Sequence, residues 1–161
     1  MNVAEIMEQR NAFSFEVFPP KTDVGMEKLC GEGGVIEKLY TLNPDYISCT
    51  YGAGGTNVGK NLEVLTKIKA DGKCTPVTHF TCVANTKEGI KDQLQTYLDN
   101  GIDHMLALRG DIPFGWTGTN GDLHYATELV KFVRKEFGDK FTIAVAGSPE
   151  GHIACRSLEA D

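Results

Sequence analysis

The sequence predicts an α/β fold built on a parallel sheet, comprising about the first five βα units of a (β/α)8, or TIM, barrel. Two observations predict this fold. Five short apolar runs alternate with segments of helical periodicity, and the first strand runs carry one small or polar face. Such alternation, at about 30 residues per unit, is typical of parallel sheets covered by helices. We expect residues 1–161 to form one partial barrel domain.

The expected strands are rich in Phe, Val, Ile, Thr and Tyr, which strands favour. They cover residues 12–18, 46–51, 77–83, 104–109 and 141–146. Between them, apolar residues recur at helical spacing and predict three regular helices. These stripes contain Val58, Leu62, Leu65 and Ile68, then Ile90, Leu94, Tyr97 and Leu98, and finally Ala126, Leu129, Val130, Val133 and Phe137.

Helix ends can also be read from the sequence. The segment 26–42 contains three glycines, so we expect a broken helix there. Asn85 with Glu88 three residues later predicts a capping box at the start of the second regular helix. Gly101 and Gly138 follow the apolar stripes and are expected to end their helices.

An open, doubly wound sheet also fits the alternation, but the strand faces favour a barrel. In the first expected strand, Ser14 and Glu16 lie on the face opposite Phe15 and Val17. A strand covered by helices on both faces is apolar on both, whereas barrel strands alternate between the lumen and the helix layer. A complete barrel needs about 250 residues, so we expect this chain to form roughly two-thirds of one.

Composition excludes several classes of protein. The net charge is −6, and no basic stripe is present, so no nucleic-acid partner is expected. No apolar run approaches the roughly 20 residues that cross a bilayer, and residues 1–10 lack the apolar core of an export signal. The five scattered cysteines are interpreted as reduced thiols, which predicts a cytoplasmic location.

Two features near the first strands could carry chemistry. Glu16 stands between Phe15 and Val17, just before two prolines, in what we expect to be a rigid and partly dry place. Burial favours the protonated form of a carboxyl group, which fits a general acid, although an ion-paired glutamate is an equal alternative. Residues 50–56 form a glycine-rich loop in which the backbone could approach a ligand closely, or which could have no ligand.

Further candidates follow the third and fourth strands. His79 and Cys82 are three residues apart in one strand and point to opposite faces, so we expect no metal site and a cofactor contact for His79. Arg109 could bind phosphate and Asp111 could accept hydrogen bonds from a heterocycle, unless the two form a strand-end ion pair. Tyr125 could stack on a ring or lie in the core.

Six segments together resemble the methylenetetrahydrofolate reductase family. They are FEVFPPK (15–21), SCTYGA (48–53), HFTC (79–82), NGI (100–102), ALRGD (107–111) and PEGH (149–152). The resemblance implies a flavoprotein oxidoreductase with non-covalent FAD, reduced by NADH or NADPH. It implies conversion of 5,10-methylenetetrahydrofolate to 5-methyltetrahydrofolate in one-carbon and methionine metabolism. It also implies that this chain is a C-terminally truncated part of a longer enzyme, and that the enzyme is a homo-oligomer at full length.

The resemblance assigns site residues by position. Glu16 matches the general acid of the family, and Asp111 matches the acid beside flavin and pterin. Ser148 stands where many bacterial members have an aromatic residue, so we expect a stacking contact to the flavin to be either missing or supplied by another residue. The positions that match the flavin or nicotinamide site are Thr50, Tyr51, Ala53, His79, Arg109, Gly110, Asp111, Tyr125, Ala126, His152 and Asp161.

Two alternatives to a working reductase remain. The first is a truncated, non-catalytic fragment that binds flavin or a partner without turnover. The second is a flavodoxin-like electron carrier, for which five parallel strands suffice. The first strand leads into Phe18-Pro19-Pro20, which offers few N–H groups to a phosphate and counts against the carrier.

Overall fold

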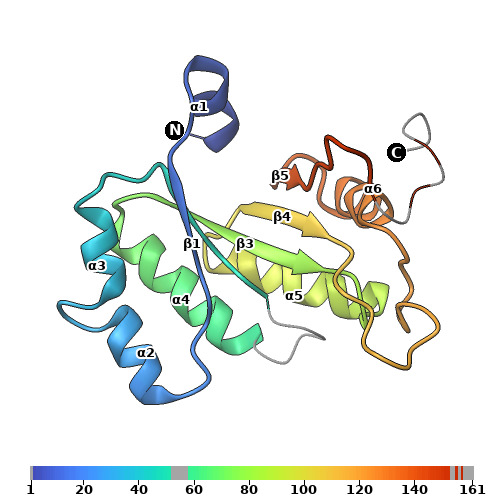
Figure 1. Cartoon of the computed structure of the whole chain (residues 1–161), viewed down its shortest axis with the longest axis horizontal. Helices are drawn as coiled ribbons and strands as arrows, with labels where there is room; N and C mark the ends of the chain where they lie inside the picture. Colours follow the sequence, from blue (N-terminus) through green and yellow to red (C-terminus); the bar gives the residue numbers. More distant parts are fainter. Residues whose placement is uncertain (1, 52–57, 153–154, 156, 158–161) are drawn as a thin grey trace.

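The computed structural model of the chain describes residues 2–51, 58–152, 155 and 157. These residues form a five-stranded sheet in which every neighbouring pair is parallel (Figure 1). The strands are β1 (Ser14–Val17), β2 (Tyr46–Cys49), β3 (Thr75–Thr81), β4 (His104–Leu108) and β5 (Thr142–Val145). Each overlaps one of the five expected ranges, so the α/β prediction is confirmed.

The order of the strands separates the two candidate architectures. The order is β1-β2-β3-β4-β5, so each strand lies beside the one that follows it in the chain. A flavodoxin-like or other doubly wound sheet reverses its strand order at a switch point, and this sheet does not. The flavodoxin-like alternative is therefore wrong, and the architecture is that of the first βα units of a TIM barrel.

The helices cover the outer face of the sheet. They are α2 (Asp23–Cys30), α3 (Val35–Tyr40), α4 (Val58–Asp71), α5 (Lys87–Asp99) and α6 (Ala126–Phe137). The broken helix expected in the first crossover is confirmed as the pair α2 and α3. Gly101 and Gly138 follow α5 and α6 with positive φ values of 73° and 61°, which glycine adopts without strain.

The capping box predicted at Asn85 is wrong by one residue. Thr86 caps α5 instead, and its hydroxyl accepts a hydrogen bond from the N–H of Gly89 at 3.1 Å. The Asn85 amide donates to the carbonyl of Thr81 at 3.0 Å. Because Asn85 is used to close the end of β3, the neighbouring threonine provides the cap.

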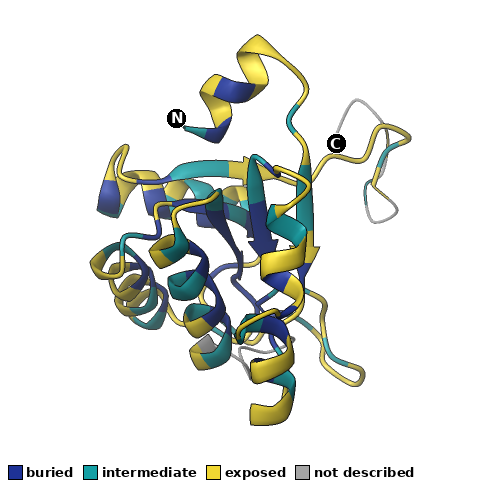
Figure 2. Ribbon diagram, turned by 90° about the vertical axis from the view of Figure 1, so that its left-hand side faces the viewer, coloured by how far each residue is buried: buried dark blue, intermediate teal, exposed yellow. Residues whose placement is uncertain are grey.

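The core lies between the sheet and the helices. Ile47 and Cys49 of β2 are fully buried, and Phe80 of β3 contacts the rings of Tyr51 and Tyr97 at centroid distances of 5.0 and 6.4 Å. Figure 2 shows the buried residues on the inner helix faces and the strands, with the exposed residues outward. The core thus occupies one face of the sheet and leaves the other free to form a lumen.

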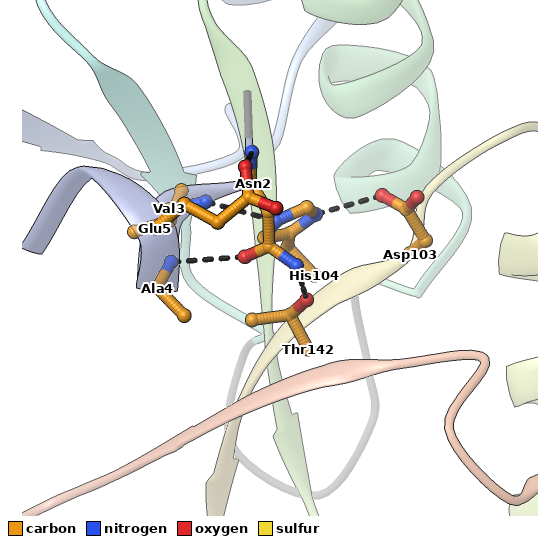
Figure 3. Close-up of polar contacts among 7 residues, drawn as sticks. All are labelled: Asn2, Val3, Ala4, Glu5, Asp103, His104 and Thr142. Carbon is orange, nitrogen blue, oxygen red and sulfur yellow. Dashed lines mark hydrogen bonds and ion pairs between the residues drawn. The ribbon is translucent and has the colours of Figure 1, made fainter. Parts of the chain in front are cut away.

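A short helix that the sequence did not predict, α1 (Val3–Gln9), packs at the N-terminal end of the sheet (Figure 1). Figure 3 shows its polar attachment. The Asn2 amide donates to the Thr142 hydroxyl at 2.7 Å, and the Val3 N–H donates to Nε2 of His104 at 3.3 Å. Nδ1 of His104 lies 2.7 Å from the carboxylate of Asp103. Since Nε2 accepts, the proton of a neutral His104 is on Nδ1 and donates to Asp103.

Asp45 joins the end of α1 to the first two strands. Its carboxylate accepts hydrogen bonds from the Arg10 guanidinium at 2.5 and 2.8 Å and from the Phe13 N–H at 2.8 Å. The Arg10 hydrogen bonds first, and the Phe13 hydrogen bond second, hold the pKa of Asp45 at about 2, below its usual value of 3.8. A depressed carboxyl pKa stabilises the folded state above the unfolded pKa, and this contribution is lost as the pH falls toward the folded pKa.

We expect Asp45→Asn to lower the free energy of unfolding at pH 7, and the difference from the wild type to shrink between about pH 4 and pH 2. Urea unfolding at a series of pH values measures this. Asp139→Asn is the matched control, because Asp139 is exposed and lies 3.9 Å from Arg134. A difference for Asp45→Asn that is independent of pH would contradict the prediction.

Candidate active site

The inner face of the sheet forms a cavity of about 470 Å³ that residues of all five strands and α1 line. The lining includes Glu16 of β1, Ser48 of β2, His79 of β3 and His104 of β4. The polar face expected of the first strands therefore does point into a lumen, on the side opposite the helices. The lining runs from the first residues of four strands to Glu16, Ser48 and His79 farther along theirs; these first residues are Ser14, Tyr46, His104 and Thr142.

One polar contact inside this cavity joins Glu16 and His79. Oε2 of Glu16 lies 3.3 Å from Nε2 of His79. The His79 side chain is 11% exposed, whereas that of Glu16 is 49% exposed. The partly dry place that we expected for Glu16 is therefore not found among the described residues, because this side of the lumen is open. His79, and not Glu16, is the member of the pair that is shielded from water.

Burial lowers the pKa of His79 below its usual 6.5, and the nearby Glu16 carboxylate opposes this effect. Burial is the larger cause, because it removes water from the imidazolium while the partly exposed carboxylate remains solvated. His79 is thus a neutral imidazole at pH 7. A neutral imidazole has one N–H donor and one nitrogen acceptor, so it can bond either form of a carboxyl group.

Thr50 follows β2 and is held at the rim of the lumen. Its N–H donates to the Val17 carbonyl at 3.0 Å, and its carbonyl accepts from the Asn61 amide at 2.9 Å. These two hydrogen bonds fix the backbone where the glycine-rich segment begins. Ala53, which the sequence placed in the cofactor site, lies outside the described residues.

The Tyr51 side chain lies on the opposite side of the sheet from the lumen. It is 2% exposed, its ring contacts Phe80, and its hydroxyl donates to Gln93 of α5. Burial raises its pKa to about 12, so the phenol stays neutral. Any contact between Tyr51 and a ligand in the lumen would therefore have to come from its backbone.

The segment that follows β4 contains Arg109, Gly110 and Asp111. The Val83 N–H donates to the Arg109 carbonyl at 2.9 Å, and Nε of Arg109 donates to the Gly110 carbonyl at 3.1 Å. Asp111 is exposed. Among the described residues, Arg109 and Asp111 do not form the ion pair considered as an alternative. The cation and the acid are therefore both available for other partners.

Gly110 has a φ of 87°, and a Cβ there would lie 2.7 Å from Cγ1 of Val83 and 3.0 Å from Cβ of Thr81. We expect Gly110→Ala to reduce the free energy of unfolding by roughly 2–4 kcal/mol, from backbone strain and overpacking together. Gly115→Ala is the matched control, because Gly115 has a φ of 85° and no atom near the added Cβ. Equal losses in urea unfolding would show that packing against β3 contributes nothing.

The remaining predicted site residues lie around the start of α6 and beyond β5. Tyr125 caps α6 and is 62% exposed, so the alternative of a core tyrosine is wrong. Ala126 is the first residue of α6, and His152 and Ser148 are exposed in the segment after β5. Asp161 lies outside the described residues. The structure brings Glu16 and His79 into contact, and the ligand roles of all these residues stay predictions.

Metal ligands, membrane spans and thiols can each be compared with the sequence predictions in the part of the chain that the structure describes. No group of three or more His, Cys, Asp or Glu residues there could hold a metal ion. No helix there is both long and apolar enough to span a bilayer. All five cysteines lie among the described residues and are free thiols. Burial raises the pKa of Cys49 to about 12 and that of Cys74 to about 11, so neither is a reactive thiolate.

Sequence analysis did not select Ser48 as a site residue. Ser48 is 8% exposed and lies in register between Glu16 of β1 and Val77 of β3. Its small side chain leaves the space in which Glu16 and His79 meet. Small and apolar residues alternate along β2, which places Ser48 on the small face. That Ser48 lies between Glu16 and His79 follows only from the register of the three strands.

Comparison with known proteins agrees with this architecture. The family model for methylenetetrahydrofolate reductase matches residues 2–161. The chain is 37% identical over 154 residues to methylenetetrahydrofolate reductase (NADH) 1 of Arabidopsis thaliana, covering 93% of this chain and 26% of that protein. It is 35% identical over 160 residues to the 5,10-methylenetetrahydrofolate reductase of Escherichia coli K12, covering 99% and 51%. The chain thus spans about half the length of its bacterial relatives and a quarter of the plant ones, and it belongs to the methylenetetrahydrofolate reductase family.

Proposed function

We propose that this chain carries the N-terminal part of the active site of a flavin-dependent 5,10-methylenetetrahydrofolate reductase, with NADH as the reductant. Membership of the family supports the folate reaction, and the names of the plant relatives, methylenetetrahydrofolate reductase (NADH) 1, support NADH. The single observation that carries the proposal is the Glu16 carboxyl group in the lumen, 3.3 Å from a buried neutral imidazole. The proposed location is the cytoplasm, as free thiols favour.

The described side chains fit FAD in their chemistry. Arg109 offers a cation for a phosphate, the exposed ring of Tyr125 could stack on an aromatic group, and Asp111 offers an acceptor to a heterocycle. When bound, FAD would accept hydride from NADH and pass it to the folate. Tyr51, in contrast, offers a ligand only its backbone, since its ring is in the core.

Glu16 would act as the general acid in the folate half of the reaction. Its carboxyl proton would pass to a bridging nitrogen of methylenetetrahydrofolate, leaving a carboxylate on Glu16. Protonation opens the imidazolidine ring to an iminium ion, whose carbon can accept hydride and become the methyl group. Asp111 would orient the pterin by accepting hydrogen bonds.

A second candidate is flavin binding without turnover. β5 pairs only with β4, and Val145 on it is 60% exposed, so the lumen is open along one side in the described residues. Exclusion of water strengthens the interactions that stabilise a transition state, so this opening favours binding alone for the chain by itself.

Reconstitution separates these candidates. The purified chain is incubated with FAD, passed through gel filtration, and examined by visible absorption. NADH and methylenetetrahydrofolate are then added, and 5-methyltetrahydrofolate is quantified. Co-eluting FAD together with methyl product supports the reductase, and co-eluting FAD without product supports the second candidate. A chain that elutes folded but without FAD would contradict both.

A further inference from the structure

Glu16 and His79 make contact although they come from strands that are not neighbours. Glu16 lies on β1 and His79 on β3, with β2 between them. Since adjacent strands are about 4.8 Å apart, the two backbones are separated by roughly 9–10 Å. The carboxylate and the imidazole nevertheless approach to 3.3 Å. Both side chains must therefore extend toward each other across the face of β2.

The residue that permits this approach is Ser48. In the β1–β2 register Glu16 is the partner of Ser48, and in the β2–β3 register Ser48 is the partner of Val77, two residues before His79. These four residues all line the same cavity. A large side chain at position 48 would fill the space between the carboxylate and the imidazole.

The charges around the pair are few. The other titratable side chains that line the cavity among the described residues are Tyr46 of β2 and His104 of β4. The lining residues that α1 and β5 contribute are uncharged. Glu16 is the charged group that acts on His79, where it opposes the effect of burial. The two groups therefore form an isolated acid–imidazole pair.

We propose that His79 is a positioning residue for Glu16, and that Ser48 provides the gap through which it acts. A general acid must keep its orientation both before and after it releases its proton. Neutral His79 can satisfy both states, because Nε2 accepts from a carboxylic acid and, in the other tautomer, Nε2–H donates to a carboxylate. A lysine or arginine in this position would hold Glu16 as the carboxylate and oppose its role as an acid.

The pair can be tested in the chain without any cofactor. The chain has four histidines, and His79→Gln identifies the His79 imidazole signals in a nitrogen-detected NMR titration. We expect Glu16→Gln to lower the pKa of His79 further, because the carboxylate that favours the imidazolium is gone. An unchanged His79 pKa in Glu16→Gln would overturn the proposal.

Ser48→Leu tests the gap while keeping both ionisable groups. Leucine should separate the carboxylate from the imidazole and so lower the pKa of His79 in the same direction. Ser14→Leu is the matched control, because Ser14 lines the same cavity on β1 but lies in register with Tyr46. A His79 that responds equally to both leucines would contradict the role of Ser48, and Glu16→Gln decides the pairing if Ser48→Leu does not fold.

The catalytic part of this inference rests on the proposed function. In the folate reaction, we expect His79→Leu to lower kcat by roughly 10–100-fold with little change in KM, and to alter the acidic limb of the pH profile. His79→Gln keeps a donor and an acceptor and should recover most of the loss. If the NMR coupling is present but kcat is unaffected, the pair exists and only its role in the reaction fails.

Discussion

Asn61→Ala is expected to cost about 3–4 kcal/mol in the free energy of unfolding, a large loss for a single polar side chain. Asn61 of α4 is fully buried and makes four hydrogen bonds. Its amide donates to the carbonyls of Cys49 and Thr50 at 3.0 and 2.9 Å. Its oxygen accepts from Tyr97 at 2.7 Å and from Thr78 at 3.3 Å.

Removal of this amide leaves buried carbonyl and hydroxyl groups without partners, and each costs about 1–3 kcal/mol when no water can replace the lost bond. The loss is a large part of the 5–15 kcal/mol that is typical of a domain. Urea unfolding followed by circular dichroism measures it. Asn11→Ala removes the same atoms from an exposed position and should change stability by less than about 0.5 kcal/mol.

Asn61→Asp separates hydrogen bonding from packing, because it keeps the size of the side chain. Its carboxylate would still accept from Tyr97, but it would face the carbonyls of Cys49 and Thr50 without a donor. We expect it to be at least as destabilising as Asn61→Ala. A mild effect of the aspartate would mean that packing, and not the two amide donors, determines the cost at this position.

Asn61 also shows where prediction from the sequence ends. The apolar stripe of α4 was recognised, because four apolar residues recur at helical spacing. A polar residue beside that stripe is ordinarily solvated, and nothing local distinguishes Asn61 from one that is exposed. Its burial depends on the carbonyls at the end of β2, which are distant in sequence and become its neighbours only in the folded chain.

The fold was predictable from two signals, one repeated along the chain and one confined to the first strands. Apolar runs alternate with helical stripes, and the polar face of β1, with Ser14 and Glu16, indicated a lumen rather than a second helix layer. α1 was missed because seven residues are too few to show a period. It is held by long-range bonds such as that from Val3 to His104. The cap was placed wrongly because Asn85 and Thr86 are both good capping residues. Asn85 bonds the end of β3 instead, and this leaves Thr86 to cap α5.

The candidate site was predictable residue by residue but not as an arrangement. Glu16 and His79 were each selected from their strand, yet their contact depends on the small size of Ser48. The exposure of Glu16 was predicted wrongly. Its apolar neighbours in the sequence point to the opposite face of the strand, so they do not shield Glu16 from water. The local sequence predicts which face of a strand a residue lies on, whereas the neighbouring strands determine its solvent exposure and its contacts.

Glu16→Gln is expected to lower the rate of 5-methyltetrahydrofolate formation by about 10²–10⁴-fold, the range over which a general acid contributes. Glutamine has nearly the same shape and can still bond His79, but it has no acidic proton to give to the folate. Oxidation of NADH with an artificial quinone acceptor requires no such proton from Glu16. We expect that rate to change by only a few-fold.

The contrast between the two rates is what identifies the role of Glu16. A variant that unfolds or no longer binds the cofactor loses both rates together, whereas loss of the acid affects only folate reduction. Because the Glu16 side chain is about half exposed, its replacement should leave the free energy of unfolding nearly unchanged. Glu8→Gln, at an exposed position on α1, should affect neither rate. Equal losses of both rates for Glu16→Gln would show that Glu16 acts in binding, and unchanged folate reduction would assign the proton to another group.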